Sequence, residues 1–218
     1  MAYLNRKNIG KFWAIPRKGT AYLAVSSHNK AESMPLVVVM REILNLVSTK
    51  KELKKLLNEK QIKINGKEIK ETNYPVCLFD VIHLKPLNKN FKAVLSEQKK
   101  MVFEEVEGKK AETKVFKVMS RKILPGKKVQ LNLNHGRNLL SDKDVAMGDS
   151  IVLNLVDNKI LDIIKLEKGK EAFVIKGKHA GFSGKIDDII ERGGKKLAKI
   201  STKNGKLNVW VKNIIVVK

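Results

Sequence analysis

The sequence predicts a multi-domain α+β protein, in which a small α/β module near the N-terminus is followed by two β-rich domains. Apolar residues recur at helical spacing in two stretches between residues 33 and 58. Asn-Gly pairs, typical of tight hairpins, occur at 65–66 and 204–205, and short alternating stretches predominate after residue 89. The expected parts are a basic extension (1–40), an α/β module (41–88), a central barrel-like β domain (89–168) and a terminal β module (169–218).

The charge of the chain predicts a polyanionic partner. The 218 residues include 45 Lys and Arg against 22 Asp and Glu, which gives a formal net charge of +23. A hydrophobic content of 43% is enough for a folded core, so a disordered basic tail is excluded. Nucleic acid is the first candidate and an anionic membrane surface the second; a charge that serves only solubility is the alternative. No apolar run approaches the ~18 residues of a membrane span.

The extension carries cations and aromatic rings without acids. No Asp or Glu occurs among residues 1–31, and Phe12, Trp13 and Tyr22 lie among the basic residues. This mixture suits RNA, because rings stack on bases while cations meet phosphates. Packing of the rings against the next domain is the alternative, and it is the preferred interpretation for Trp13.

Residues 33–47 predict a core helix. Ser33 is the expected N-cap and Pro35 lies in the first turn. The stripe expected to face the core consists of Val39, Ile43, Leu46 and Val47. Arg41 is expected to point away from it.

A second helix begins after Thr49, which stands three residues before Glu52 in the spacing of a capping box. Its apolar stripe is Leu53, Leu56 and Leu57. Lysines crowd the other side, and like charges at this spacing weaken a helix by about 0.2–0.5 kcal/mol per pair. A sequence that tolerates this repulsion indicates an anionic partner. The lysines are Lys50, Lys51, Lys54 and Lys55.

A hairpin follows directly, with Asn65-Gly66 at its turn. A two-residue loop places Lys63 opposite Glu68 and Ile62 opposite Ile69. The chain then breaks at Tyr74-Pro75 and returns as a strand over residues 79–84.

The remaining chain predicts β structure. Residues 113–141 contain no acid, and Val129, Leu131 and Leu133 alternate with polar residues as in a half-buried strand. Further strands are expected at 151–155 and 160–166.

The terminal module begins with a strand at 173–175 and a glycine-framed loop that contains lysines. This loop does not fit the Walker phosphate-binding pattern, because Ile186 follows Lys185 where Ser or Thr is required. The second hairpin is expected to place Ile200 opposite Val209 and Thr202 opposite Leu207. Trp210 and the run 214–217 are expected to close the module.

Catalytic and metal-site patterns are absent from the sequence. No frame typical of a Ser or Cys nucleophile surrounds any candidate, and the four histidines lack metal-ligand spacing. Cys77, the single cysteine, is interpreted as a small buried apolar residue and fits a reducing compartment. We therefore expect no enzyme, cofactor, metal or small-molecule substrate, and a cytoplasmic location, since no signal-peptide pattern opens the chain.

Several short motifs follow one another along the whole chain. They are Met34-Pro35-Leu36, Ile64-Asn65-Gly66-Lys67, Tyr74-Pro75, Asp80-Val81-Ile82, His135-Gly136-Arg137-Asn138, Gly148-Asp149 and residues 177–186. Their order resembles the archaeal and eukaryotic ("e") type of small-subunit ribosomal protein four. Residues 41–84 resemble the αL-type RNA-binding module, which many RNA-modifying enzymes share. The last fifty residues resemble a KOW module, an SH3-like barrel also found in transcription elongation factors.

This resemblance implies a structural protein of the small ribosomal subunit that binds small-subunit rRNA, in its 5′ region, beside neighbouring ribosomal proteins. A membrane partner and homo-oligomerisation are not expected. The expected RNA-binding residues are Arg6, Lys7, Lys11, Arg17, Lys18, His28, Arg41, Lys50, Lys51, Lys54, Lys55, Lys63, Lys67, Arg121, Lys122, His135, Arg137, Lys176, Lys178 and His179. The expected loop-shaping residues are Asn65, Gly66, Gly136, Gly177, Gly181 and Gly184.

Two other functions stay open at this point. The chain could be an RNA-binding accessory subunit of an RNA-modifying enzyme, although it is too short and too poor in clustered acids to carry a catalytic domain itself. It could also be a KOW-type transcription elongation or RNA chaperone factor.

Overall fold

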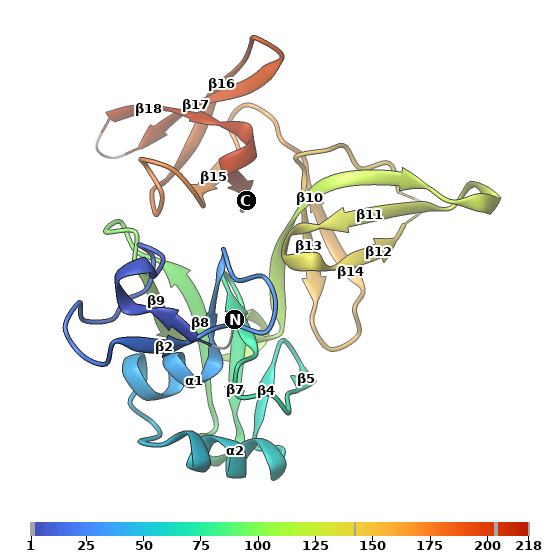
Figure 1. Cartoon of the computed structure of the whole chain (residues 1–218). Coiled ribbons are helices and arrows are strands. Elements are labelled where there is room, and N and C mark those ends of the chain that lie inside the picture. Colours follow the sequence, from blue (N-terminus) through green and yellow to red (C-terminus); the bar gives the residue numbers. More distant parts are fainter. Residues whose placement is uncertain (1–2, 142, 203–204, 218) are drawn as a thin grey trace. The chain divides into compact units, whose positions relative to one another are not determined.

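The chain divides into two compact units, with the boundary after Lys114. The structure, a computed structural model, describes residues 3–141, 143–202 and 205–217, without the side chains of residues 109, 110 and 127. Figure 1 shows the whole chain coloured along the sequence.

The first unit opens with the basic extension, which includes strands β1 (Tyr3–Asn5) and β2 (Tyr22–Ala24) and the short 3-10 helix η1 (Arg6–Asn8). The two strands pair antiparallel. Trp13 is buried and belongs to the hydrophobic core of this unit. The interpretation of Trp13 as a packing residue is therefore confirmed.

The predicted helix start at Ser33 is wrong. Residues Ser33–Pro35 form strand β3, which pairs antiparallel with β6 (Pro75–Cys77). The Ser33 hydroxyl donates to the carbonyl of Asn29 over 2.7 Å instead of capping a helix. The pairing with β6 holds this segment extended, and Pro35 supports it, because a proline disfavours helical backbone at the residue before it.

The first helix is shorter than predicted. Helix α1 (Leu36–Val38) continues as the π-helical turn η2 (Val39–Ile43), and Asn45 then adopts a left-handed φ of 51°. The prediction that Leu46 faces the core is wrong, because this side chain lies beyond the helix and is exposed. The backbone amide of Leu46 instead donates to the carbonyl of Met40.

Helix α2 (Lys50–Asn58) has the predicted capping box. The backbone amide of Glu52 donates to the Thr49 hydroxyl over 3.3 Å, and the Glu52 carboxylate accepts from the backbone amide of Ser48 over 2.8 Å. These contacts hold the pKa of Glu52 below its usual value, with the Ser48 amide as the largest cause. Leu53 and Leu57 are buried, which confirms the apolar stripe.

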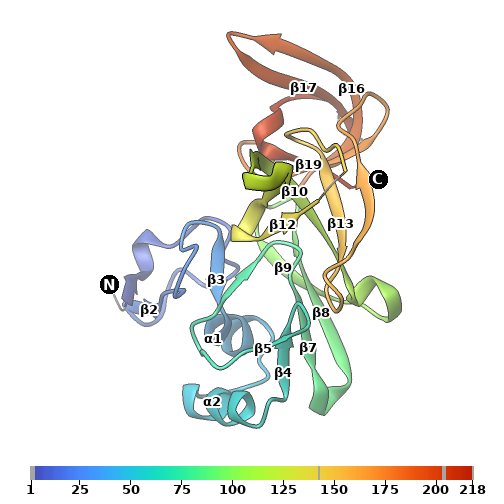
Figure 2. The same ribbon diagram turned by 90° about the vertical axis from the view of Figure 1, so that its right-hand side faces the viewer.

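The two helices lie on one side of a five-stranded antiparallel sheet (Figure 2). Its order is β5-β4-β7-β8-β9, and in it Lys63 pairs with Glu68, as predicted for the hairpin. The strands are β4 (Ile62–Ile64), β5 (Lys67–Glu68), β7 (Val81–Leu84), β8 (Lys89–Leu95) and β9 (Met101–Glu105).

The predicted boundary between residues 88 and 89 falls within the first sheet, because this sheet continues into strands β8 and β9. The 3-10 turn η3 (Lys85–Leu87) and the left-handed Asn88 return the chain at once, so that β8 pairs with β7. This short connection makes residues 89–105 part of the first sheet.

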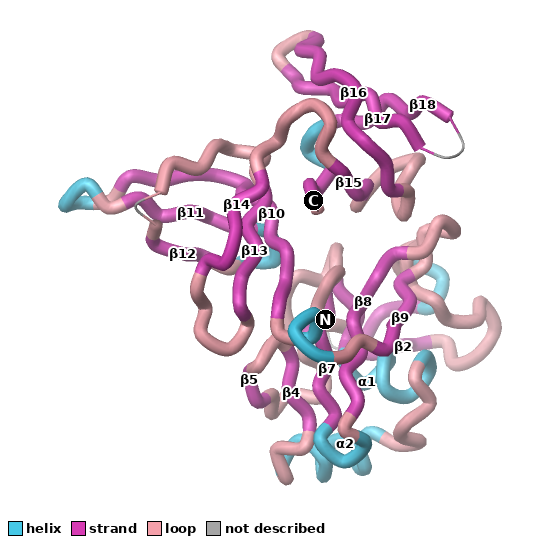
Figure 3. The backbone as a smooth tube through the Cα atoms, turned by 180° about the vertical axis from the view of Figure 1, so that it is seen from behind, coloured by secondary structure: helices cyan, strands magenta, loops and turns pink. Residues whose placement is uncertain are grey.

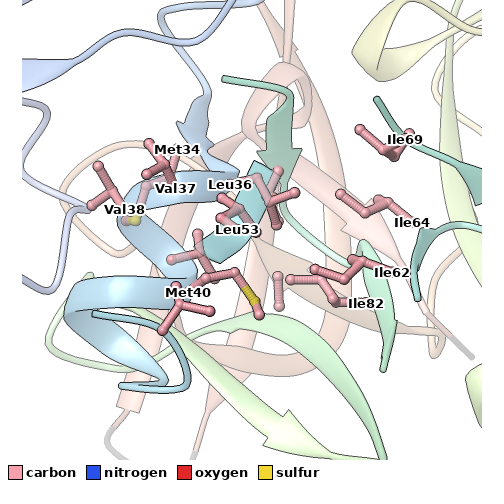
Figure 4. Packing of buried hydrophobic residues seen from close by; sticks show 14 of the residues in the cluster. Met34, Leu36, Val37, Val38, Met40, Leu53, Ile62, Ile64, Ile69 and Ile82 are labelled. Atoms are coloured by element: carbon pink, nitrogen blue, oxygen red, sulfur yellow. The ribbon is translucent and has the colours of Figure 1, made fainter. Parts of the chain in front are cut away.

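The core of this unit joins both helices to the sheet. Figure 4 shows Leu36 of α1 and Leu53 of α2 near Ile62 and Ile82 of the strands. All four are at most 1% exposed. Such packing fixes the orientation of α2 and therefore of its outer side.

A buried ion pair lies beneath the hairpin. Lys114, which the sequence placed in an acid-free run of cations, is buried and forms an ion pair with the buried Asp80. Asp80 also accepts from the backbone amide of Cys77 over 2.6 Å and from the side-chain amide of Asn65 over 2.7 Å. Burial, with the negative charge of Asp80 as the next cause, raises the pKa of the Cys77 thiol to about 12. Cys77 is buried, as predicted.

The second unit contains two five-stranded sheets, whose strands are magenta in Figure 3. The first has the order β12-β11-β10-β13-β14. The half-buried strand predicted at residues 129–133 is confirmed, with Leu131 and Leu133 buried. The strands are β10 (Thr113–Ile123), β11 (Val129–Leu133), β12 (Asn138–Leu140), β13 (Ser150–Asn154) and β14 (Ile160–Ile164).

The other sheet has the order β18-β17-β16-β15-β19. Its core includes Val174, Ile186, Ala198 and Ile200. The strands are β15 (Glu171–Val174), β16 (Ser183–Arg192), β17 (Lys195–Thr202), β18 (Gly205–Trp210) and β19 (Ile214–Val216).

The predicted register of the second hairpin is wrong by two residues. Ile200 pairs with Leu207 and Thr202 with Gly205. Residues 203 and 204, which include one half of the predicted turn, lie outside the described residues. A shift by two keeps every side chain on the same face of the sheet, so the apolar alternation cannot distinguish the two registers.

Lys117 on β10 is a second buried lysine, and it lies in the same acid-free run of residues 113–141. Its ammonium group donates to the carbonyl of Ile214 over 2.7 Å and to that of Val211. Burial lowers its pKa to about 8. These contacts tie β10 to the 3-10 turn η7 (Val211–Asn213) and to β19.

Candidate nucleic-acid interface

The outer side of α2 is a row of exposed lysines. Within the part of the chain that the structure describes, only Lys55 has an acidic partner, Glu59, at 4.0 Å. The buried stripe of α2 packs against the core and holds the helix in place. A partner can therefore bind the exposed lysines without a large loss of backbone freedom. The row consists of Lys50, Lys51, Lys54 and Lys55.

A hollow of about 500 Å³ lies beside this helix. Four lysines from three segments line it, together with several polar residues and one acid, Glu71. Clustered positive charge around a hollow attracts phosphate groups. The lysines are Lys30 of the extension, Lys50 and Lys54 of α2, and Lys70 after the hairpin.

Lys30 and Lys70 were not among the predicted RNA-binding residues. Lys30 ends the acid-free extension, which is a weak signal, whereas Lys70 follows the hairpin without any motif. Their proximity to α2 depends on the fold of the whole unit, so local patterns do not reveal it.

The hairpin holds its turn rigidly. Asn65 and Gly66 have φ angles of 50° and 76°, the left-handed values that an Asn-Gly turn requires. The Asn65 side chain accepts from the amide of Val81 over 3.0 Å and donates to Asp80. Lys67 beside the turn is exposed, whereas Lys63 is half-buried and lies 3.9 Å from Glu68.

In the extension, the Arg6 side chain is held by hydrogen bonds to other residues of the same segment. Its guanidinium donates to the carbonyls of Thr20 and Pro16, each over 2.7 Å, and to the Thr20 hydroxyl. This engagement disfavours Arg6 as a phosphate ligand. The other predicted residues of this segment are exposed: Lys7, Lys11, Arg17 and Lys18.

His28 and Arg41 have partners within the chain. His28 is exposed, with Nδ1 at 3.0 Å from the Ser27 hydroxyl and its ring edge-on to Tyr74. Arg41 is half-buried and forms an ion pair with Glu42 over 2.7 Å. The Arg41 charge is therefore already compensated.

The predicted central residues lie on the first sheet of the second unit and its turns. Arg121 forms an ion pair with Asp144 over 2.7 Å, while Lys122 is exposed. Arg137 lies over the ring of Phe116, with its guanidinium carbon 5.5 Å from the ring centroid. His135 has a left-handed φ of 60°, and Gly136 follows at 76°.

The glycine loop after β15 presents exposed Lys176 and Lys178, while His179 is half-buried. Gly177 and Gly181 have φ angles of 99° and 94°, which favour glycine. Gly184 instead meets a neighbouring strand, since a Cβ atom there would lie 2.3 Å from the Ser201 carbonyl oxygen.

Among residues 3–141, 143–202 and 205–217, no group of three or more His, Cys, Asp or Glu side chains is placed to hold a metal ion. No helix in these ranges is long and apolar enough to cross a membrane.

Comparison with known proteins shows which family the chain belongs to. The S4 domain profile matches residues 34–82 and the profile of ribosomal family S4e matches residues 87–160. The chain is 36% identical to small ribosomal subunit protein eS4 of Methanosphaera stadtmanae, over 86% of this chain and 79% of that protein. It is 34% identical to the eS4 protein of Archaeoglobus fulgidus, over 85% and 80%.

A solved structure agrees with these matches. The crystal structure of the 30S ribosomal protein S4e from Thermoplasma acidophilum has a TM-score of 0.73 and 27% identity, and the match covers 85% of this chain and 95% of that one. From its sequence and its fold, the chain belongs to the ribosomal S4e family.

Proposed function

We propose that this chain is a structural, non-enzymatic component of the small ribosomal subunit that binds small-subunit rRNA. The observation that carries the proposal is the lysine-lined hollow beside α2, where three separate segments bring four cations together. The names of the relatives, small ribosomal subunit protein eS4, support the same conclusion.

Binding would proceed by neutralisation of phosphates. Each lysine that meets a phosphate releases condensed counterions, so affinity falls as salt rises. The capping box and the buried Leu53 and Leu57 hold α2 in place before binding, so little order has to be gained when RNA arrives. The exposed Lys67 beside the anchored Asn65-Gly66 turn extends the same surface.

We also propose a specific RNA target, protein partners and a location. The RNA target is the 5′ region of small-subunit rRNA, the other partners are neighbouring ribosomal proteins, and the location is the ribosome in the cytoplasm. In this proposal the sheet of residues 171–216 is the SH3-like barrel of a KOW module; its five antiparallel strands around a shared core support that assignment.

The test is the affinity of the full chain for two rRNA fragments of equal length, one from the 5′ region and one from the 3′ region. We expect tighter binding to the 5′ fragment, and an affinity that falls linearly on logarithmic axes between about 50 and about 200 mM salt. Equal affinities for both fragments would leave only nonspecific attraction and contradict the assignment to the 5′ region.

A further inference from the structure

An exposed tryptophan in the second unit lies in a hollow of about 520 Å³. Trp210 is the last residue of β18 and 41% of it is exposed. The rest of the hollow is formed by Lys195, Lys196, Val211, Lys212 and Asn213.

The strand geometry explains why the indole faces outward. Successive side chains of a strand point to opposite faces, and Val209 takes the inward position with 6% exposure. Trp210 pairs with the half-buried Leu197 on the outer face of β17. The core is complete without the indole, so the packing of this sheet does not account for a tryptophan at this position.

The charged residues that line this hollow are all lysines. Lys195 places its ammonium nitrogen 5.9 Å from the centre of the Trp210 ring. Across the described residues, no carboxylate lies within 4.0 Å of the ammonium nitrogens of Lys195, Lys196 or Lys212. Lys196 stands opposite Glu191 in the ladder without forming an ion pair. The hollow therefore favours an anionic occupant.

We propose that this hollow binds an unpaired RNA nucleotide, with its base stacked on Trp210 and its flanking phosphates on the three lysines. The inference rests on the proposed RNA-binding function, but it adds a site on a surface that the lysine row of α2 does not include. A base and an indole stack well because both present flat π faces, and stacking is typically worth more than one exposed lysine contact to a ring. Lys195 can therefore move from the ring to a phosphate.

The nucleotide has to be unpaired. In a duplex the bases are stacked on one another, and the deep, narrow major groove of A-form RNA does not admit large side chains. An acidic protein segment would satisfy the lysines but would leave the indole without a stacking partner. The combination of one exposed indole and three cations therefore fits single-stranded RNA better than either.

The experiment follows tryptophan fluorescence of the full chain during titration with a single-stranded oligoribonucleotide of about eight residues. Binding itself is measured by fluorescence anisotropy of labelled RNA. We expect quenching by the single strand and none by a duplex of equal length. The same titration of Trp210→Phe should show no quenching while RNA still binds, because the buried Trp13 does not respond.

Truncation gives the affinity readout. We expect Trp210→Ala to weaken single-strand binding about tenfold, whereas Leu161→Ala, a truncation of another exposed apolar side chain of this unit, leaves it unchanged. Trp210→Phe keeps a ring, so the fluorescence comparison holds even if the alanine variant folds poorly.

Three results would overturn the inference. RNA that binds without quenching Trp210 would remove the stacking site and leave the proposed function intact. Equal quenching by duplex RNA or by an acidic peptide would show general anion binding. Absence of any binding of the single strand would contradict this inference alone, because the two rRNA fragments test the proposed function separately.

Discussion

Replacement of Lys50, Lys51, Lys54 and Lys55 by glutamate is expected to abolish most binding to the 5′ rRNA fragment. Two of these lysines line the hollow, and all four are exposed on the outer side of α2. Reversal turns attraction for phosphates into repulsion, so we expect at least about a hundredfold loss at low salt and a salt slope reduced by about four. The measurement is the affinity as a function of salt concentration.

The same variant should remain folded. The buried Leu53 and Leu57 and the capping box are unchanged, and glutamates in the first turn interact favourably with the helix dipole. We therefore expect an unchanged circular dichroism spectrum. The matched control reverses four exposed lysines elsewhere, Lys99, Lys159, Lys165 and Lys170. An equal loss in both variants would mean that net charge alone, and not the face of α2, determines affinity.

The second large effect is on stability: Asp80→Ala is expected to lower the free energy of unfolding by about 3–5 kcal/mol. The substitution leaves Lys114 buried without its carboxylate partner and removes the acceptor of the Cys77 amide. The Asn65 side chain also loses an anchor, which loosens the hairpin turn next to Lys67. Urea unfolding followed by circular dichroism measures the change.

A neutral replacement of the pair separates the charge effect from the lost contacts. In Asp80→Asn/Lys114→Met the buried charges are gone while the shapes are roughly kept, so we expect a smaller loss than for Asp80→Ala alone. A cost of less than about 1 kcal/mol for Asp80→Ala would show that the pair contributes little to the stability of the first unit.

The features that could be predicted from the sequence are local ones. The capping box depends on Thr49 and Glu52, three residues apart, and the pairing of Lys63 with Glu68 depends on the Asn-Gly turn between them. In each case the two partners lie only a few residues apart in the sequence, so the residue types and their spacing determine the geometry.

The features that could not be predicted depend on partners far along the chain. Lys114 is buried because Asp80, 34 positions earlier, accepts a hydrogen bond from its ammonium group and pairs with its charge. Lys117 is buried because the carbonyls of Val211 and Ile214 accept hydrogen bonds from its ammonium group. Composition and spacing cannot distinguish these two lysines from solvated ones. The strand at Ser33 has the same origin, since its partner is the segment after Tyr74.

The candidate site was predicted in part. The lysines of α2 could be found from their periodicity, but the contributions of Lys30 and Lys70 to the hollow arise only from tertiary packing. The sequence placed Trp210 in the terminal module, but its pairing with Leu197 is needed to show that the indole faces outward.

The most direct test of the central claim is sedimentation of cell lysate through a sucrose gradient in moderate and in high salt, with detection of this chain. If it is a structural component of the small subunit, it co-migrates with that subunit in a stoichiometric amount and remains bound in moderate salt. Its presence only at the top of the gradient, or with RNA polymerase, would contradict the proposed function.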